Sequence, residues 1–227
     1  MGEILEVMRH AIGASLLAAC ALLAACGSQE DTQGKATYVK QALSAMTGGK
    51  EKPATGPQNL TRAKLARVTS PLLVVEVEGT SAWALMVPFQ TNGGVVTWSS
   101  TDDRTVALRD GVLLATRGLG PDLMSAEVPS AARIASASGN YLRVHYQIDG
   151  LDQTVKREYR CTLATDGPKT ITIVERNYPT RHVLEHCEGA TGQFTNEYWV
   201  DDAGTIRQSR QTFDQGLGKL KISRVID

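Results

Sequence analysis

Cys26 is the residue whose chemistry the sequence indicates most directly. It ends the run Leu23-Ala24-Ala25-Cys26 and follows an almost wholly apolar stretch that begins at Ala11. This arrangement is typical of a bacterial lipoprotein signal, in which a peptidase cuts before the cysteine and the new N-terminal residue carries acyl chains such as palmitate. Small side chains before the cut allow the backbone to lie flat in the peptidase. We expect Cys26 to be the site of lipid attachment.

Other interpretations of this segment are open. The apolar stretch is shorter than the roughly 20 residues that cross a bilayer as a helix, which favours a cleaved signal over a permanent span or a buried core helix. Cys20 ends a similar run, but a cut there would leave apolar residues beside the anchor. Glu3 and Glu6 cancel the positive charge expected at the start of a signal, so Met8 is an alternative start.

The pattern predicts three segments. Residues 1–25 form the signal peptide, residues 26–35 a polar tether, and residues 36–227 a single β-rich domain, which is long enough to bury a core. The 24 basic and 24 acidic residues balance. A balanced charge argues against nucleic acid as a partner, because that would require a clustered basic face. The expected membrane contact is therefore the lipid itself.

Cys161 and Cys187 remain after the anchor. An exported chain folds in an oxidising compartment, where such a pair usually forms a disulfide. Two free buried thiols are the alternative. A zinc site would need more ligands at closer spacing than this pair supplies.

His182 and His186 stand near Cys187 and raise the question of a metal site. Residues 180–187 have the pattern of a strand, and at about 3.3 Å per residue the two rings would lie about 13 Å apart. One zinc ion needs nitrogen ligands within about 2.1 Å, so we expect surface or cross-strand histidines, with no metal and no cofactor.

Acidic pairs and tryptophans offer weaker signals of carbohydrate chemistry. Asp102-Asp103 and Asp201-Asp202 fall in turns, where aspartate is expected for its local hydrogen bonds, whereas a glycosidase needs two carboxylates that converge on one bond. Trp83, Trp98 and Trp199 could stack on sugar rings, but tryptophan is more often a core residue. Arg207, Ser209 and Gln211 alternate along one strand and form a polar face that either binds a glycan or is simply solvated.

The elements that position these residues are expected to be mainly strands. A short amphipathic helix is expected over residues 36–46, and another helical turn over residues 60–67. From Leu72 onward, about ten short runs with period-two alternation are separated by turn signals. These signals are Gly79-Thr80, Asn92-Gly93, Asp102-Asp103, Asp110-Gly111, Asp149-Gly150, Asp166-Gly167 and Asp202-Ala203-Gly204. Over residues 141–149, Leu142, Val144, Tyr146 and Ile148 alternate with Arg143, His145, Gln147 and Asp149.

Strands joined by tight turns must be antiparallel. The fold class is therefore mostly β: an antiparallel meander that curls into a barrel-like or half-barrel sheet with its apolar face inside, preceded by a short N-terminal helix. A two-sheet sandwich is the alternative. The stretch from Arg117 to Asn140 breaks the rhythm, so its loop is a weak candidate functional site, or else a structural corner. The residues in question are Gly118, Leu119, Gly120, Asp122 and Leu123.

Several segments, in the same order and spacing, resemble the YjbF/GfcB family of bacterial lipoproteins over residues 30–227. They are Thr97–Ser100, Asp110-Gly111, Thr116–Leu123, Tyr159–Cys161, Glu185–Cys187, Phe194–Asp201 and Ile206–Gln211. The resemblance implies an outer-membrane lipoprotein that takes part in making or exporting an exopolysaccharide or group 4 type capsule. It also implies a mostly β, barrel-like fold, and it transfers no catalytic residue.

Three hypotheses follow. The first is a non-enzymatic accessory lipoprotein on the periplasmic face of the outer membrane, which works with other envelope proteins of polysaccharide export. Glycine after Cys26, rather than aspartate, is consistent with sorting to the outer membrane. The second is a lipid or glycan carrier that uses the interior of the half-barrel. The third is a glycan-cleaving enzyme, which would need acids, or an acid and a histidine, meeting in a cleft.

Overall fold

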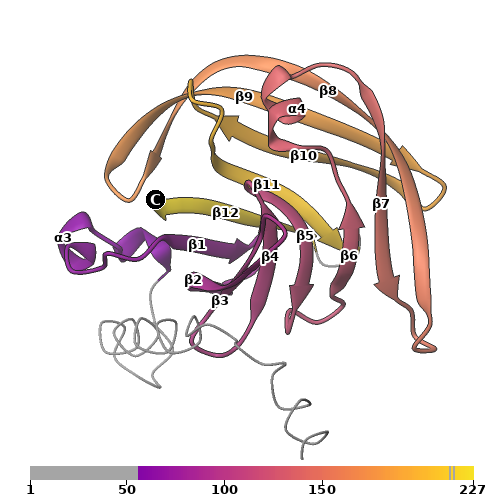
Figure 1. Ribbon diagram of the computed structural model, residues 1–227, viewed down its shortest axis with the longest axis horizontal. Coiled ribbons are helices and arrows are strands. Elements are labelled where there is room, and N and C mark those ends of the chain that lie inside the picture. The colour runs from indigo at the N-terminus through magenta and orange to yellow at the C-terminus, as the bar shows by residue number, and fades with distance from the viewer. Residues whose placement is uncertain (1–55, 215, 217) are drawn as a thin grey trace, which may run out of the picture. The chain divides into compact units, whose positions relative to one another are not determined.

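Strands joined by short connections make up most of the chain after Ser70 (Figure 1). The computed structural model describes residues 56–214, 216 and 218–227. In this part of the chain lie η2 (Pro57–Asn59), α3 (Arg62–Leu65), α4 (Ala131–Ser136) and the strands β1 (Leu72–Val77), β2 (Trp83–Asn92), β3 (Val95–Ser99), β4 (Thr105–Arg109), β5 (Val112–Arg117), β6 (Leu123–Glu127), β7 (Asn140–Ile148), β8 (Thr154–Ile173), β9 (Arg176–Gly189), β10 (Gly192–Val200), β11 (Ile206–Asp214) and β12 (Gly218–Ile226). Cys26, the predicted tether and the helix expected over residues 36–46 lie outside the described residues.

All twelve strands belong to one antiparallel sheet, which curls into a nearly closed barrel shape (Figure 1). Its order is β5-β4-β3-β2-β1-β12-β11-β10-β9-β8-β7-β6. Strands that follow one another in the sequence pair with each other, except β5 and β6, which form the two edges of the sheet. The first strand, β1, also pairs with the last, β12. The predicted fold class is confirmed, because the strands form one curled sheet and not a two-sheet sandwich. The sheet has twelve strands, two more than the roughly ten expected.

Hairpin turns form where the polar dipeptides predict them, with one exception. In the β4–β5 turn, Asp110 and Gly111 have φ values of 50° and 91°, the left-handed region that a tight hairpin requires and that aspartate and glycine accept. The turn predicted at Asp166-Gly167 is wrong. Those residues lie within the long strand β8, where the register against β9 shifts between Thr165 and Gly167, so the pair forms a bulge.

The edge strands β5 and β6 come together to close the barrel (Figure 1). Side chains link them. Arg117 Nη1 and Nη2 donate to the carbonyl oxygens of Leu123 and Met124, both at 3.1 Å, and the Leu123 amide donates to Thr116 Oγ1 at 3.0 Å. These bonds satisfy backbone groups that an edge strand would otherwise leave unpaired. We call this junction the β5–β6 seam.

Apolar side chains pack on both faces of the sheet. Inside, one cluster gathers residues from β1 to β6, β11 and β12, and a second packs beneath Ile134 of α4. Outside, Leu72 and Val74 of β1 lie beneath α3 and the far end of the β8–β9 hairpin. Arg62 fastens that end, because its Nε donates to the carbonyl of Val174 and its Nη1 to that of Val225, both at 2.7 Å.

Strand β7 reverses the expected sense of burial. Its alternation is as predicted, but the polar set Arg143, His145 and Gln147 is buried inside, whereas Leu142 and Ile148 are 52% and 46% exposed. The expectation that the apolar face of every strand lies inside is therefore wrong for β7. The physical reason is that partners for these polar groups also lie inside, so their burial leaves few hydrogen bonds unmade.

Candidate functional site

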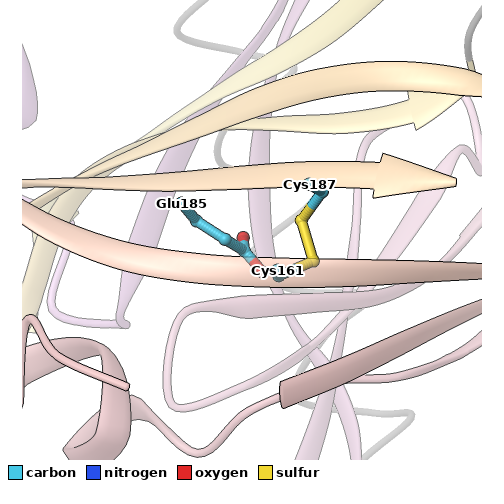
Figure 2. A group of neighbouring side chains, drawn as sticks. All are labelled: Cys161, Glu185 and Cys187. Carbon is cyan, nitrogen blue, oxygen red and sulfur yellow. A yellow bond between two sulfur atoms is a disulfide. The ribbon is translucent and has the colours of Figure 1, made fainter. Parts of the chain in front are cut away.

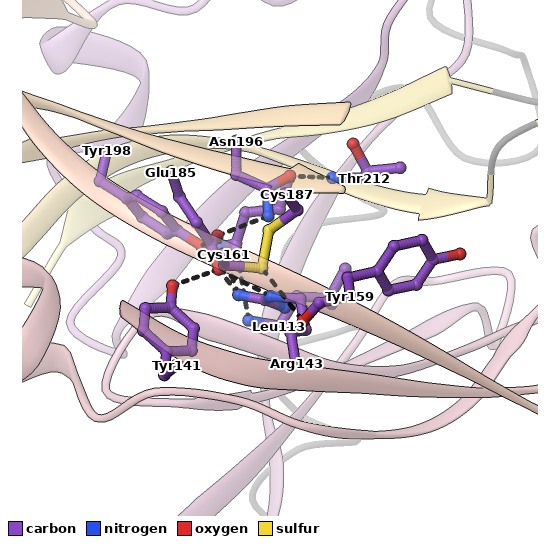
Figure 3. Close-up of polar contacts among 11 residues, drawn as sticks. Leu113, Tyr141, Arg143, Tyr159, Cys161, Glu185, Cys187, Asn196, Tyr198 and Thr212 are labelled. Atoms are coloured by element: carbon purple, nitrogen blue, oxygen red, sulfur yellow. Dashed lines mark hydrogen bonds and ion pairs between the residues drawn. A yellow bond between two sulfur atoms is a disulfide. The ribbon is translucent and has the colours of Figure 1, made fainter. Parts of the chain in front are cut away.

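A buried polar network surrounds Glu185 (Figure 3). Glu185 on β9 and Arg143 on β7 face inward from strands separated by β8. Arg143 donates from Nε to Glu185 Oε1 at 2.8 Å and from Nη2 to Oε2 at 3.0 Å, which is the paired geometry that suits a guanidinium and a carboxylate. Their side chains are 1% and 0% exposed, so water screens this ion pair very little.

Three more side chains donate to the same carboxylate. Asn196 Nδ2 lies 2.7 Å and the Tyr198 hydroxyl 2.8 Å from Glu185 Oε2, and the Tyr141 hydroxyl bonds Oε1. Asn196 and Tyr198 belong to β10, directly beside β9 in the sheet, and Tyr141 belongs to β7. Glu185 thus reaches donors on two strands besides its own, and both of its oxygens are satisfied.

The charges of this network are fixed near neutral pH. Burial alone would raise the pKa of Glu185, but the Arg143 charge and hydrogen bonds bring that pKa below its ordinary value. Burial alone would lower the pKa of Arg143, and the facing carboxylate raises it instead. Burial, followed by the Glu185 charge, raises the pKa values of Tyr141 and Tyr198. Glu185 therefore stays ionised, and none of these groups is poised near neutrality to transfer a proton.

The network continues across the interior to β5. Asn196 Oδ1 accepts from the backbone amide of Thr212 at 2.7 Å. Gln211 on β11 donates to the carbonyl of Gly111 and accepts from the amide of Leu113, both at 2.8 Å. Since β11 and β5 are far apart in the sheet order, the Gln211 side chain connects the two strands across the interior. Gln147 does the same, donating from β7 to the carbonyl of Phe213 at 3.0 Å.

A disulfide joins Cys161 and Cys187, as predicted (Figure 2). The two cysteines are direct cross-strand partners on β8 and β9, and both are buried on the inner face. With Glu185 they bring possible metal-ligand atoms within 4.8 Å of one another. Disulfide sulfurs lack the thiolate charge that metals bind, and Glu185 is already neutralised by Arg143. The group is therefore a structural cross-link beside an ion pair.

His145 lies inside the barrel among aromatic rings. It stacks on Phe194 with ring centroids 5.7 Å apart and meets the Tyr159 ring edge-on at 5.4 Å. Its Nε2 is buried and has no hydrogen-bond partner among the described residues. Burial, with the nearby Arg143 charge added, lowers the pKa of His145 to about 3. The imidazole is consequently neutral under ordinary conditions.

The two histidines first considered as metal ligands lie on the outer face with separate partners. His182 lies between Asp166, 2.8 Å from Nδ1, and Glu197, 3.1 Å from Nε2, and it stacks on Trp199. His186 bonds Thr195 at 3.0 Å and is exposed. The structure therefore does not bring His182 and His186 together.

The acids and tryptophans singled out in the sequence have local roles. Asp102 pairs with Arg104 at 3.1 Å, and Asp201 accepts from the amides of Ala203 and Thr205 in the β10–β11 turn. Trp98 and Trp199 are buried and present no flat face for a sugar ring.

The candidate loop between β5 and β6 is held by Asp122. Its Oδ1 accepts from the Thr116 hydroxyl at 2.8 Å and from the Leu119 amide at 3.2 Å, and its Oδ2 accepts from the Gly118 amide at 2.8 Å. Leu123 is buried, and Leu119 packs against the inner cluster. These contacts support the structural corner over a binding loop, and Gly118 and Gly120 allow it through their φ values of 79° and 114°.

Sequence reasoning did not identify the Arg143–Glu185 pair. Each residue was visible within an alternating strand, but an alternating charge is the usual mark of a solvated face. One available signal was the position of Glu185 two residues before Cys187, which places both side chains on the same face of a strand. Cys187 was expected in a disulfide, and the structure buries that disulfide on the inner face, so the same spacing places Glu185 inside as well.

A small cavity between β4, β11 and β12 measures about 10 Å³, roughly the room for one water molecule. Elsewhere in the described interior, buried side chains from facing strands meet. The cavity between β4, β11 and β12 is too small for the acyl chain or sugar that the carrier hypothesis requires. None of the helices in the described part of the chain has the length and apolar character needed to cross a bilayer.

Comparison with known proteins identifies a matching family and a similar fold. Residues 37–225 match the family model described as YjbF, group 4 capsule polysaccharide lipoprotein gfcB. The fold is similar to the crystal structure of the hypothetical lipoprotein YmcC from Escherichia coli (K12), with a TM-score of 0.70 and 17% sequence identity, covering 88% of this chain and 98% of that chain. At this identity the likeness concerns the fold alone. No curated protein matches the chain.

Proposed function

This chain belongs to the YjbF family of group 4 capsule polysaccharide lipoproteins, and from that membership we propose that it is a non-enzymatic accessory of exopolysaccharide or capsule production, fixed to the periplasmic face of the outer membrane by acyl chains on Cys26. The single observation that supports this most strongly is the family match over residues 37–225. The lipoprotein signal that ends at Cys26 and the polar residues that follow it supply independent support from the sequence.

The non-enzymatic part of the proposal draws on the interior network. Glu185 is sealed among donors and neutralised by Arg143, so it has neither a free lone pair for a substrate nor a proton to give. Asp102 and Asp201 are engaged in turns at different hairpins. We therefore propose that the protein acts through contacts with other envelope proteins of the polysaccharide export apparatus.

Deletion of the gene tests the role. We expect secreted polysaccharide to fall under inducing conditions and to be restored by the wild-type gene, whereas Cys26→Ser, which leaves residues 36–227 unchanged, should fail to restore it. A Glu185→Gln variant serves as the test for catalysis, provided that its folded amount is matched to the wild type. Normal polysaccharide in the deletion strain would contradict the proposed role, and loss of polysaccharide with folded Glu185→Gln would contradict its non-enzymatic character.

A further inference from the structure

Two arginines at one end of the sheet converge on a single carboxylate. Arg207 of β11 donates from Nη1 to both carboxylate oxygens of Asp227, at 2.9 and 2.8 Å. Arg224 of β12 approaches the same group, with its Nε 4.0 Å from Oδ1. Arg207 has a second acid, because its Nε lies 2.6 Å from Asp201 Oδ2. Arg207 would therefore remain paired if Asp227 moved away.

Arg224 is left without a hydrogen bond at its inner nitrogen. Its Nε is buried and has no acceptor among the described residues, and 4.0 Å to Asp227 is too long for a hydrogen bond. A buried charged donor without an acceptor is costly, so the site favours an oxygen that comes closer than Asp227 does. Asp227 is also the more exposed partner, at 61% against 22% for Arg224. An incoming oxyanion could therefore take its place.

The small cavity of about 10 Å³ lies against the same arginines. Arg207, Ser209 and Arg224 supply its polar lining, and Leu73 and Gly111 contribute to the remainder. A side chain at position 111 would crowd this space, since a Cβ there would lie 3.0 Å from Cβ of Ile206, and the φ of 91° is strained for any residue with a side chain. The cavity accepts a group the size of one water molecule, such as a single carboxylate oxygen.

We propose that Arg207 and Arg224 form a carboxylate-binding site that Asp227 occupies from within the chain, and that its ligand is the carboxylate of an acidic sugar residue. The class of ligand follows from two guanidinium groups, one of them short of an acceptor, beside a pocket sized for one oxygen. The choice of a sugar rests on the proposed function in polysaccharide production. An acidic peptide segment of another protein has the same chemistry, and it is an outcome of the test.

Binding is measured by calorimetry on the full chain purified in detergent, with an oligosaccharide of glucuronic acid as the probe and a glucose oligosaccharide of equal length as the neutral comparison. Asp227→Asn should bind the acidic probe about fivefold more tightly than the wild type, because the competing carboxylate is gone. Arg224→Gln should lose most of this binding, and so should Arg224→Gln combined with Asp227→Asn. Arg160→Gln, an exposed arginine elsewhere on β8, serves as the matched control and should bind as the wild type does.

Equal binding of acidic and neutral oligosaccharides, or binding unaffected by Arg224→Gln, would overturn the site. So would absence of binding by Asp227→Asn. Tighter binding of an aspartate-containing peptide than of the oligosaccharide would overturn the sugar as ligand. Thermal unfolding of each variant establishes that it is folded. Because the assay measures binding of purified protein, its failure is distinct from failure of the polysaccharide phenotype.

Discussion

Glu185 keeps its charge inside the sheet because Tyr141, Arg143, Asn196 and Tyr198 all donate to it. Such a buried pair adds little net stability over an apolar pair of similar volume, but the loss of one partner strands the other charge. The network therefore specifies which strands face one another more than it strengthens the fold. Its residues come from β7, β9 and β10, which must be correctly curled before the donors meet.

Replacing Arg143 with methionine should destabilise the protein by about 3–5 kcal/mol, because Glu185 would remain buried without its counter-charge. Urea unfolding followed by circular dichroism measures this. The double variant Arg143→Met, Glu185→Leu should recover much of the loss, whereas Arg160→Met on the exposed face of β8 should change stability by less than about 0.5 kcal/mol. A loss below about 1 kcal/mol for Arg143→Met alone would contradict the buried ion pair.

His145 predicts a specific sensitivity to acid. The folded pKa of about 3 lies below the ordinary value of 6.5, so between these two values the unfolded chain binds more protons than the folded one. Stability contributed by neutral His145 is therefore complete above pH 6.5 and is lost as pH falls toward 3. Between pH 8 and pH 5 the expected loss is about 2 kcal/mol.

His145→Phe keeps an aromatic ring against Phe194 and removes the titrating group, so it should abolish this pH dependence in urea unfolding curves. His186→Asn, which changes an exposed histidine on β9, should leave the dependence in place. The assignment to His145 fails if both variants retain the full dependence.

At the scale of elements, side chains hold the β5–β6 seam together, whereas backbone hydrogen bonds join the other neighbouring strands of the sheet. Arg117 supplies two of its bonds, to Leu123 and Met124. Arg117→Ala should therefore open this junction locally, with amide exchange in β5 and β6 accelerated about tenfold and exchange in β1 and β12 unchanged. Hydrogen exchange with mass spectrometry resolves these segments. If amide exchange in β5 and β6 of the variant is as slow as in the wild type, the seam does not depend on Arg117.

The strands and hairpins could be predicted from the sequence more reliably than the face that each strand turns to the interior. Turn residues such as Asp110-Gly111 have a local conformational requirement, so the hairpins were predictable, and hairpins dictate an antiparallel meander. Asp166-Gly167 has the same local signature, but β8 continues to pair with β9 on both sides of these residues, so they form a bulge instead of a turn. The inward face of β7 was not predictable, because Arg143 is buried only where Glu185 is present across the interior. That proximity depends on sheet curvature, which alternation does not encode.

At the scale of the whole molecule, the described strands form a nearly closed sheet (Figure 1), which the proposed function attaches to a membrane through lipid on Cys26. The described interior is occupied by the Glu185 network and apolar clusters, so the surfaces available for contact are the outer face and the ends of the barrel. Exposed Leu142 and Ile148 lie on that outer face. Under the proposed function, partners in polysaccharide export would contact the protein at these surfaces.

Mass spectrometry of the N-terminal peptide from membrane-fractionated protein tests the anchoring claim most directly. The mature chain should begin at Cys26 and have the mass of acyl chains added to it, and Cys26→Ser should abolish both the added mass and the membrane association. An unmodified residue 26 in a chain that retains residues 1–25 and remains in the cytosol would contradict the account.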